Sequence, residues 1–174
     1  MLPRETNEAL NDQLQLEFAS AYLYLGMAAH FAAASLPGFA HWMRLQHEEE
    51  ELHALKFFDY ITQRGGRVAL RAIEAPPSEP GEYGSPLEVF ERSLEHERLV
   101  TERIHGLYAR AQEARDYPTL TFLQWFVTEQ VEEESTVQEI VDRLRLAGGN
   151  STALLFLDRE LAGRAAAPPA AVGG

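Results

Sequence analysis

Six residues that could bind or orient a metal ion recur with the same spacing in the two halves of the sequence. They are Glu17, Glu50 and His53 in the first half and Glu97, Gln130 and Glu133 in the second. In each half the second residue follows the first by 33 positions, and the third follows the first by 36. Scattered surface acids have no reason to share a register, so the pattern indicates an internal repeat with pseudo-twofold symmetry. Carboxylate and imidazole donors suit Fe(II), Mn(II) or Zn(II).

Glu50 and His53 form a Glu-x-x-His motif, which Gln130 and Glu133 repeat as a variant. Residues three apart lie on one face of a helix, so both side chains of such a pair can reach the same ion. One glutamate from each of two helices, combined with Glu-x-x-His motifs from the others, is the ligand pattern of di-iron centres in helical bundles. The sequence therefore predicts a two-metal site, with the full motif in one half and a variant in the other.

The helices that must position these residues are marked by their periodicity and by signals at their ends. Ser85 and Glu88 form a capping box that begins one helix, and glycine pairs at 65–66 and 148–149 end two others. Residues 66–84 are rich in proline and glycine, so we expect a linker there. The expected helices span residues 6–34, 38–64, 85–115, 118–147 and 151–162.

The lengths of the connections predict the topology. Short turns join the first helix to the second and the third to the fourth, so each pair forms an antiparallel hairpin. The linker 66–84 is long enough to run the length of a helix between the two hairpins. The fold class is therefore all-α: an up-down-down-up four-helix bundle with one long crossover and a short fifth C-terminal helix. We expect one domain at 1–162, followed by a flexible Ala/Pro/Gly-rich tail at 163–174.

Positions that recur at steps of three and four give each long helix an apolar stripe with polar or acidic residues near its middle. The four stripes contain Leu10, Leu14, Glu17, Ala21, Tyr24 and Ala28; Phe39, Met43, Gln46, Glu50, His53, Phe57 and Tyr60; Phe90, Leu94, Glu97, Thr101, Ile104 and Tyr108; and Thr119, Leu123, Phe126, Gln130, Glu133, Val137, Ile140 and Leu144. Carboxylates gathered at one depth of a core lose hydration and repel one another, and a multivalent cation offsets both effects. The stripes therefore predict a metal site inside the bundle.

Composition excludes several other classes of function. A net charge of −12 repels nucleic acids and anionic membranes, so we expect neither as a partner. The absence of cysteine excludes thiolate catalysis, zinc–cysteine sites and iron–sulfur clusters. The longest apolar stretch, 22–36, is too short to span a bilayer, and residues 1–8 contain no apolar signal segment. We therefore expect a cytoplasmic protein.

Four stretches, taken together in their order, resemble the bacterial non-haem ferritins. They are residues 14–17 (LQLE), 48–53 (EEEELH), 96–98 (HER) and 122–134 (FLQWFVTEQVEEE). The resemblance covers about residues 1–162 and implies a ferritin-like bundle in a homo-oligomeric, hollow cage of 24 subunits. It also implies iron storage: a ferroxidase centre in each subunit oxidises Fe(II) with dioxygen or hydrogen peroxide, and the cage keeps the product as ferric oxyhydroxide mineral.

The same resemblance implies roles for individual residues. Glu17, Glu50 and His53 would hold the first iron, while Glu50, Glu97 and Glu133 would hold the second, with Glu50 bridging the two.

Further residues would lie around this pair of irons. Gln130 would lie beside it, towards the oxygen-binding side. Tyr24 would hydrogen-bond near the centre, although an ordinary packed core tyrosine explains it equally well. A third iron just inside the cage would use Glu49, Glu129 and Glu132, shared with Glu133; the alternative is that these flanking acids are simply solvated.

Four other kinds of protein are alternatives, and each leads to a different expectation. Bacterioferritin resembles the chain but binds haem through a methionine after the second-helix glutamate, where this sequence has Glu51 and Leu52, so we expect no haem. Mini-ferritins that coat DNA lack a fifth helix. A di-iron oxygenase needs a substrate cavity beside the metals, and the stripes are filled with large apolar residues. A metal-free structural bundle leaves the matched acids unexplained. The amount of iron bound per chain separates the last two from a ferritin.

Overall fold

The structure, a computed structural model, describes residues 2–79 and 81–166, and its regular elements are five helices. All five begin and end within two residues of the predicted bounds. They are α1 (Arg4–Ala33), α2 (Pro37–Gln63), α3 (Pro86–Glu113), α4 (Tyr117–Ala147) and α5 (Ser151–Leu161). None of the helices in the described part of the chain is both long and apolar enough to cross a membrane. Most of the predicted tail, from residue 167 on, lies outside the described residues.

The helix ends follow the local signals of the sequence. The Ser85 hydroxyl accepts a hydrogen bond from the Glu88 backbone N–H at 3.3 Å, and the Glu88 carboxylate accepts one from the Ser85 N–H at 2.7 Å. This confirms the capping box at the start of α3. At the end of α4, Gly148 adopts a left-handed conformation with φ of 56°, which glycine tolerates at little cost.

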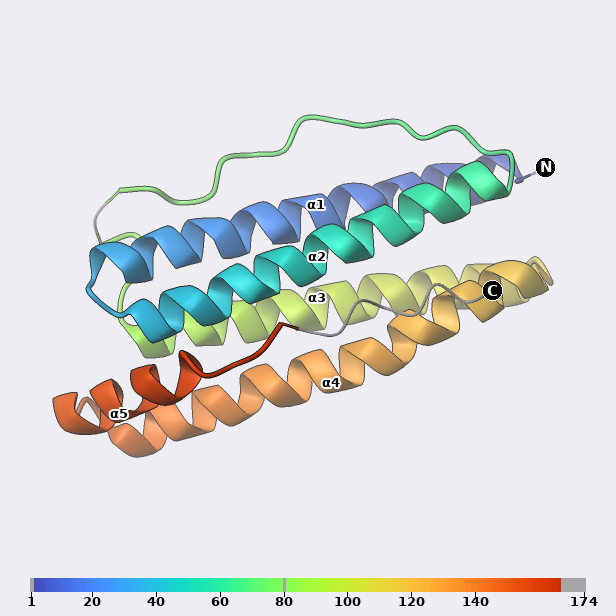
Figure 1. Cartoon of the computed structure of the whole chain (residues 1–174). Helices are drawn as coiled ribbons and strands as arrows, with labels where there is room; N and C mark the ends of the chain where they lie inside the picture. Colours follow the sequence, from blue (N-terminus) through green and yellow to red (C-terminus); the bar gives the residue numbers. More distant parts are fainter. Residues whose placement is uncertain (1, 80, 167–174) are drawn as a thin grey trace.

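The four long helices form the predicted up-down-down-up bundle, with α1 packed on α2 and α3 packed on α4 (Figure 1). The crossover between α2 and α3 runs along α1 and returns the chain to the end of the bundle where α2 began. Asn11 holds it there, because its amide donates to the Arg67 carbonyl at 3.0 Å and accepts from the Ala69 N–H at 2.7 Å. The long connection therefore makes α2 and α3 parallel.

The core is divided into two apolar clusters with a polar layer between them. One cluster lies at the end near α5 and contains Phe31, Phe39, Trp42 and Phe90 among its largest members. The other lies at the opposite end and contains Leu10, Leu14, Phe57, Leu123 and Phe126. The predicted stripe positions are buried, except that Tyr60, Thr101 and Tyr108 are half-buried. The layer between the clusters is therefore where the acidic stripe residues meet.

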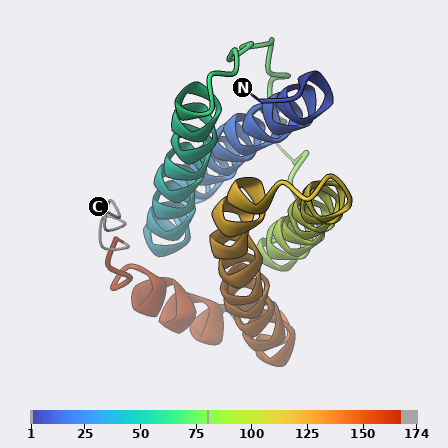
Figure 2. The same cartoon turned by 90° about the vertical axis from the view of Figure 1, so that its right-hand side faces the viewer.

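The fifth helix crosses the end of the bundle at the start of α2, as the view along the helices shows (Figure 2). Its Asp158 is buried, and the carboxylate accepts a hydrogen bond from the Phe39 N–H at 2.9 Å. A side chain at Gly38 would place its Cβ 1.6 Å from the Asp158 carbonyl oxygen. The close approach of the two backbones therefore requires glycine at position 38.

Candidate metal centre

The polar layer contains the residues that the sequence repeat singled out. Each of the four long helices contributes at least one of them, and all are buried. They are Glu17 on α1; Glu50 and His53 on α2; Glu97 on α3; and Gln130 and Glu133 on α4. A carboxylate is costly to bury without partners, so four in one layer indicate a site rather than packing.

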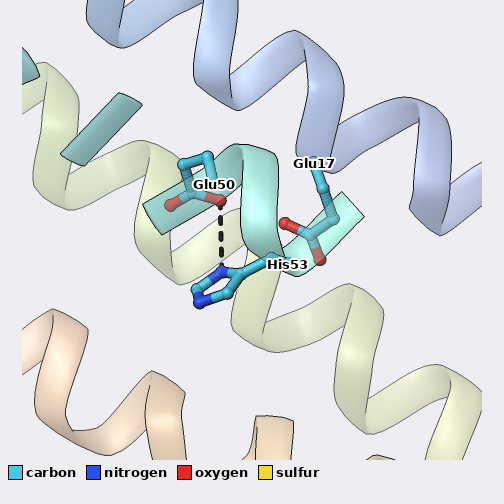
Figure 3. Close-up of side chains that lie close together, drawn as sticks. All are labelled: Glu17, Glu50 and His53. Carbon is cyan, nitrogen blue, oxygen red and sulfur yellow. Dashed lines mark ion pairs between the residues drawn. The ribbon is translucent and has the colours of Figure 1, made fainter. Parts of the chain in front are cut away.

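Glu17, Glu50 and His53 come together as predicted. One ligand atom from each lies within 4.8 Å of the others. Figure 3 shows the two carboxylates and the imidazole facing one another, with Glu50 Oε2 3.4 Å from His53 Nδ1. The Oε2 atoms of Glu17 and Glu50 are both buried and accept no hydrogen bond. Two free, buried carboxylate oxygens beside an imidazole fit a divalent cation with oxygen and nitrogen ligands.

Gln13 orients the first of these carboxylates, and the sequence analysis missed it. Its side-chain amide donates to Glu17 Oε1 at 2.8 Å, and both residues are buried on α1. The signal was available, because a residue four positions before a helical glutamate lies on the same face. With Oε1 held by Gln13, the Oε2 atom of Glu17 is the one left to bind a ligand.

Glu97 is held by the two residues that the sequence placed beside the centre. The Tyr24 hydroxyl donates to Glu97 Oε1, and the Gln130 amide donates to Glu97 Oε2 at 3.3 Å. Gln130 also donates to the backbone carbonyl of Glu97 at 3.2 Å. Of the two interpretations of Tyr24, the structure therefore supports the hydrogen bond near the centre.

Glu133 is held by a residue for which the sequence analysis had assigned no role. Gln46 was predicted only as a buried polar member of the α2 stripe, and its amide donates to Glu133 Oε2 at 2.6 Å. One oxygen of Glu133 also groups with His53 and Glu129, with the three ligand atoms within 4.8 Å of one another. Glu129 and Glu133, two of the acids predicted for a third iron, therefore lie together beside His53.

The other two acids predicted for a third iron are more exposed. Glu49 is half-buried on α2, and Glu132 is exposed on α4. Glu49 is not free, because Arg164 donates to its Oε2 at 2.7 Å. An arginine of the same chain therefore reaches the acidic edge where the third iron is predicted.

The electrostatics of the layer follow from burial and from the closeness of like charges. Burial raises the pKa of Glu17 well above its usual value, and the charge of Glu50 adds to the effect. Burial and then the charge of Glu97 raise the pKa of Glu50 in the same way. Burial raises the pKa of Glu97, although the hydrogen bonds from Tyr24 and Gln130 oppose it.

Glu133 and Glu129 are shifted in the same direction. Burial, with a further contribution from the charge of Glu97, raises the pKa of Glu133 to about 8. Partial burial also raises the pKa of Glu129. In the absence of metal, Glu133 therefore keeps its proton at neutral pH, and a cation that binds this carboxylate must displace that proton.

Known proteins resemble this chain over nearly its whole length. A family model described as a ferritin-like domain matches residues 7–147. The bacterial non-heme ferritin of Staphylococcus haemolyticus is 42% identical over 164 residues, which is 94% of this chain and 97% of that protein. The bacterial non-heme ferritin of Escherichia coli O157:H7 is 40% identical over 92% of this chain and 96% of its own length.

Solved structures show the same likeness. The open-pore ferritin of the hyperthermophilic archaeon Archaeoglobus fulgidus is 51% identical, covers 95% of this chain and 100% of its own, and superposes with a TM-score of 0.92. An engineered closed form of that ferritin is 50% identical over 96% of this chain and 100% of its own, also with a TM-score of 0.92. The matching family model, the curated relatives and the bundle with its buried acidic layer agree, and the chain belongs to the ferritin family.

Proposed function

We propose that the chain is the subunit of an iron-storage ferritin that oxidises Fe(II) to Fe(III) at a di-iron centre within each bundle. The proposed ligands are Glu17, Glu50, His53, Glu97 and Glu133. The observation that supports this most directly is the pair of buried, unpartnered oxygens of Glu17 and Glu50 beside His53. A purely structural core has no use for such atoms, because each costs about 1–3 kcal/mol when it is left without a partner.

The proposed ligands explain why Fe(II) bound at this site would be oxidised. Carboxylate oxygens are hard and anionic, so they stabilise Fe(III) relative to Fe(II) and favour oxidation of the bound ions. Two Fe(II) ions lose one electron each, and dioxygen accepts the two electrons together with two protons. Tyr24 and Gln130 keep Glu97 in place, Gln46 keeps Glu133 in place, and Gln13 keeps Glu17 in place while the charge of the site changes.

Storage requires an assembly with an acidic interior where the oxidised iron can form a ferric oxyhydroxide mineral. We propose a homo-oligomeric cage of 24 subunits, supported by family membership and by the likeness to the A. fulgidus ferritins. Those two structures are an open-pore ferritin and an engineered closed form of it. The third iron, the absence of haem, hydrogen peroxide as an alternative oxidant and the cytoplasmic location stay predictions.

Size-exclusion chromatography of protein loaded aerobically with Fe(II) tests the proposal. We expect a particle of several hundred kilodaltons that carries many more irons than its chains could ligate directly. A di-iron oxygenase would stop at about two irons per chain, as the ligand pattern of such centres sets, and a structural bundle would bind little. A monomer or dimer at micromolar concentration and neutral pH would contradict the cage.

A further inference from the structure

Arg164 lies just beyond the end of α5 and reaches back across the bundle to the edge of the proposed centre. Its guanidinium donates to Glu49 Oε2 at 2.7 Å and to Gln46 Oε1 at 2.9 Å. The same group stacks on Trp42, with Cζ 4.7 Å from the ring centroid. The Arg164 side chain is 22% exposed and that of Glu49 is 14% exposed, so the pair is largely shielded from water.

The three α2 residues that receive Arg164 form one continuous stripe. Trp42, Gln46 and Glu49 are separated by steps of four and three, so they share a helix face. A planar guanidinium can stack on an aromatic ring and donate two hydrogen bonds in its own plane at the same time, which a lysine cannot do. The backbone carbonyl of Arg164 also lies 2.9 Å from His41 Nε2. Arg164, three residues after the end of α5, is therefore held on α2 by several contacts.

The contact is connected to the metal centre in two ways. Gln46 accepts from Arg164 through Oε1 and donates to Glu133 Oε2 through Nε2 at 2.6 Å, so Arg164 fixes the orientation of the amide that holds Glu133. In addition, Glu49 lies near enough to Glu129 and Glu133 for its charge to act on both carboxyl groups. A cation bound to Glu49 is therefore also a cation at the edge of the second cluster.

We propose that Arg164 is a built-in counter-ion that pairs with Glu49 Oε2 and, through Gln46, orients Glu133, so that a metal ion that binds Glu49 must compete with the arginine. This inference rests on the proposed function of the inner centre and adds a residue that weakens metal binding at its outer edge. Arg164 is a positioning residue, because it touches the neighbours of the proposed ligands. Iron at the outer edge is then held weakly and can move on, while the inner ligands keep their own geometry.

Calorimetric titration of the assembled, metal-free protein with Co(II) tests this without turnover, because Co(II) accepts the same oxygen and nitrogen donors. In Arg164→Gln the weakest class of Co(II) sites should tighten by about tenfold, the scale of one lost charge-assisted contact. Arg164→Lys should tighten Co(II) binding less than Arg164→Gln, because an ammonium group can still pair with Glu49, although it cannot also stack on Trp42 and hold Gln46. Unchanged affinity in Arg164→Gln, or equal tightening in both variants, would overturn the proposal.

Two further variants separate the proposal from a general loosening of α5. Arg143 pairs with Glu160 on α5 through two hydrogen bonds, 2.9 and 2.5 Å long, and Arg143→Gln should leave Co(II) binding unchanged. In the Glu49→Gln background, Arg164→Gln should no longer tighten binding, because the competed carboxylate is gone. Tighter Co(II) binding in Arg143→Gln or in the double variant would contradict the proposed role of Arg164. Failure of aerobic iron loading would instead count against the proposed function, whatever the Co(II) result.

Discussion

The Tyr24 hydroxyl on α1 donates a hydrogen bond to Glu97 Oε1 on α3, inside the bundle and away from water. This bond joins the two hairpins at the level of the acidic layer. It also leaves Glu97 with one oxygen facing Gln130. The tyrosine therefore restricts the rotamers of a residue that is proposed to ligate the metal. Such supporting partners commonly affect metal affinity or activity by about 10–100-fold.

The Tyr24→Phe variant should keep its fold and slow the rapid phase of Fe(II) oxidation by roughly tenfold. It loses a single hydrogen bond, so its stability should fall by only about 1 kcal/mol. Stopped-flow absorbance of anaerobic Fe(II)-loaded protein mixed with dioxygen measures the rate. Tyr108→Phe is the matched control, because Tyr108 donates from α3 to the exposed Gln124 at 3.3 Å. An equal change of rate in both variants would show that Tyr24 does not act through Glu97.

Alanine substitutions of Glu17, Glu50 and His53 should each abolish the rapid phase, because each removes a proposed ligand. Gln130→Ala should slow the phase less, since Gln130 only donates to Glu97. Slow mineral growth should persist in all four variants, because it needs only an acidic interior surface. If Gln130→Ala and Glu50→Ala lost the rapid phase equally, the division into ligands and supporting residues would be wrong.

Gly38 is the position where the docking of α5 can be tested. Gly38→Ala would place a methyl group 1.6 Å from the Asp158 carbonyl oxygen, which forces α5 away from α2. Forced overpacking of this kind costs about 1–3 kcal/mol of stability. Because Arg164 should move away together with α5, the weakest class of Co(II) sites should also tighten in this variant, as in Arg164→Gln. Gly106→Ala is the control, because its methyl group meets nothing within 4 Å, and alanine favours a helix by about 0.5–1 kcal/mol. Thermal melts and light scattering measure stability and assembly, and equal melts for the two variants would refute the close contact.

The fold could be predicted from the sequence because its signals are local. Ser85 and Glu88 mark a helix start by residue type alone, and glycine at position 148 marks an end. The long linker indicates the topology because it can run the length of a helix between the two hairpins. The buried acidic layer could be predicted because acids with a repeated spacing interrupt the apolar stripes at the same level of the bundle.

Contacts that depend on side-chain direction or on α5 could not be predicted in this way. Arg164 and Gln46 are 118 positions apart, and their meeting depends on the angle at which α5 crosses α2. The Nε2 atom of His96 lies 2.7 Å from the Ser20 hydroxyl, and burial lowers the pKa of this histidine to about 4. Neither contact leaves a periodic signal in the sequence.

Replacing Glu133 with glutamine should stabilise the metal-free protein in a pH-dependent way. Burial raises the pKa of Glu133 from 4.5 to about 8 in the folded chain, whereas the unfolded chain has the ordinary value. Below pH 4.5 the carboxyl group is protonated in both states and imposes no charge penalty. As pH rises from 4.5 to about 8, the unfolded chain ionises while the folded chain keeps its proton, so the parent loses stability; above about 8 the loss levels off. Glutamine cannot ionise and can still accept from Gln46.

The free energy of unfolding should therefore differ little between Glu133→Gln and the parent at pH 5, and should favour the variant at pH 8.5 by on the order of 2–4 kcal/mol. Glu139→Gln, at an exposed position of the same helix, should show no such pH-dependent gain. Saturating Co(II) should reverse the order, because a ligand that binds only the folded state stabilises the parent, which keeps its full ligand set. Denaturant titrations at the two pH values, with and without Co(II), measure all three differences. A Glu133→Gln variant no more stable than the parent at pH 8.5 would mean that this carboxyl group is hydrated in the folded protein, and the buried acidic layer would lose one of its four members.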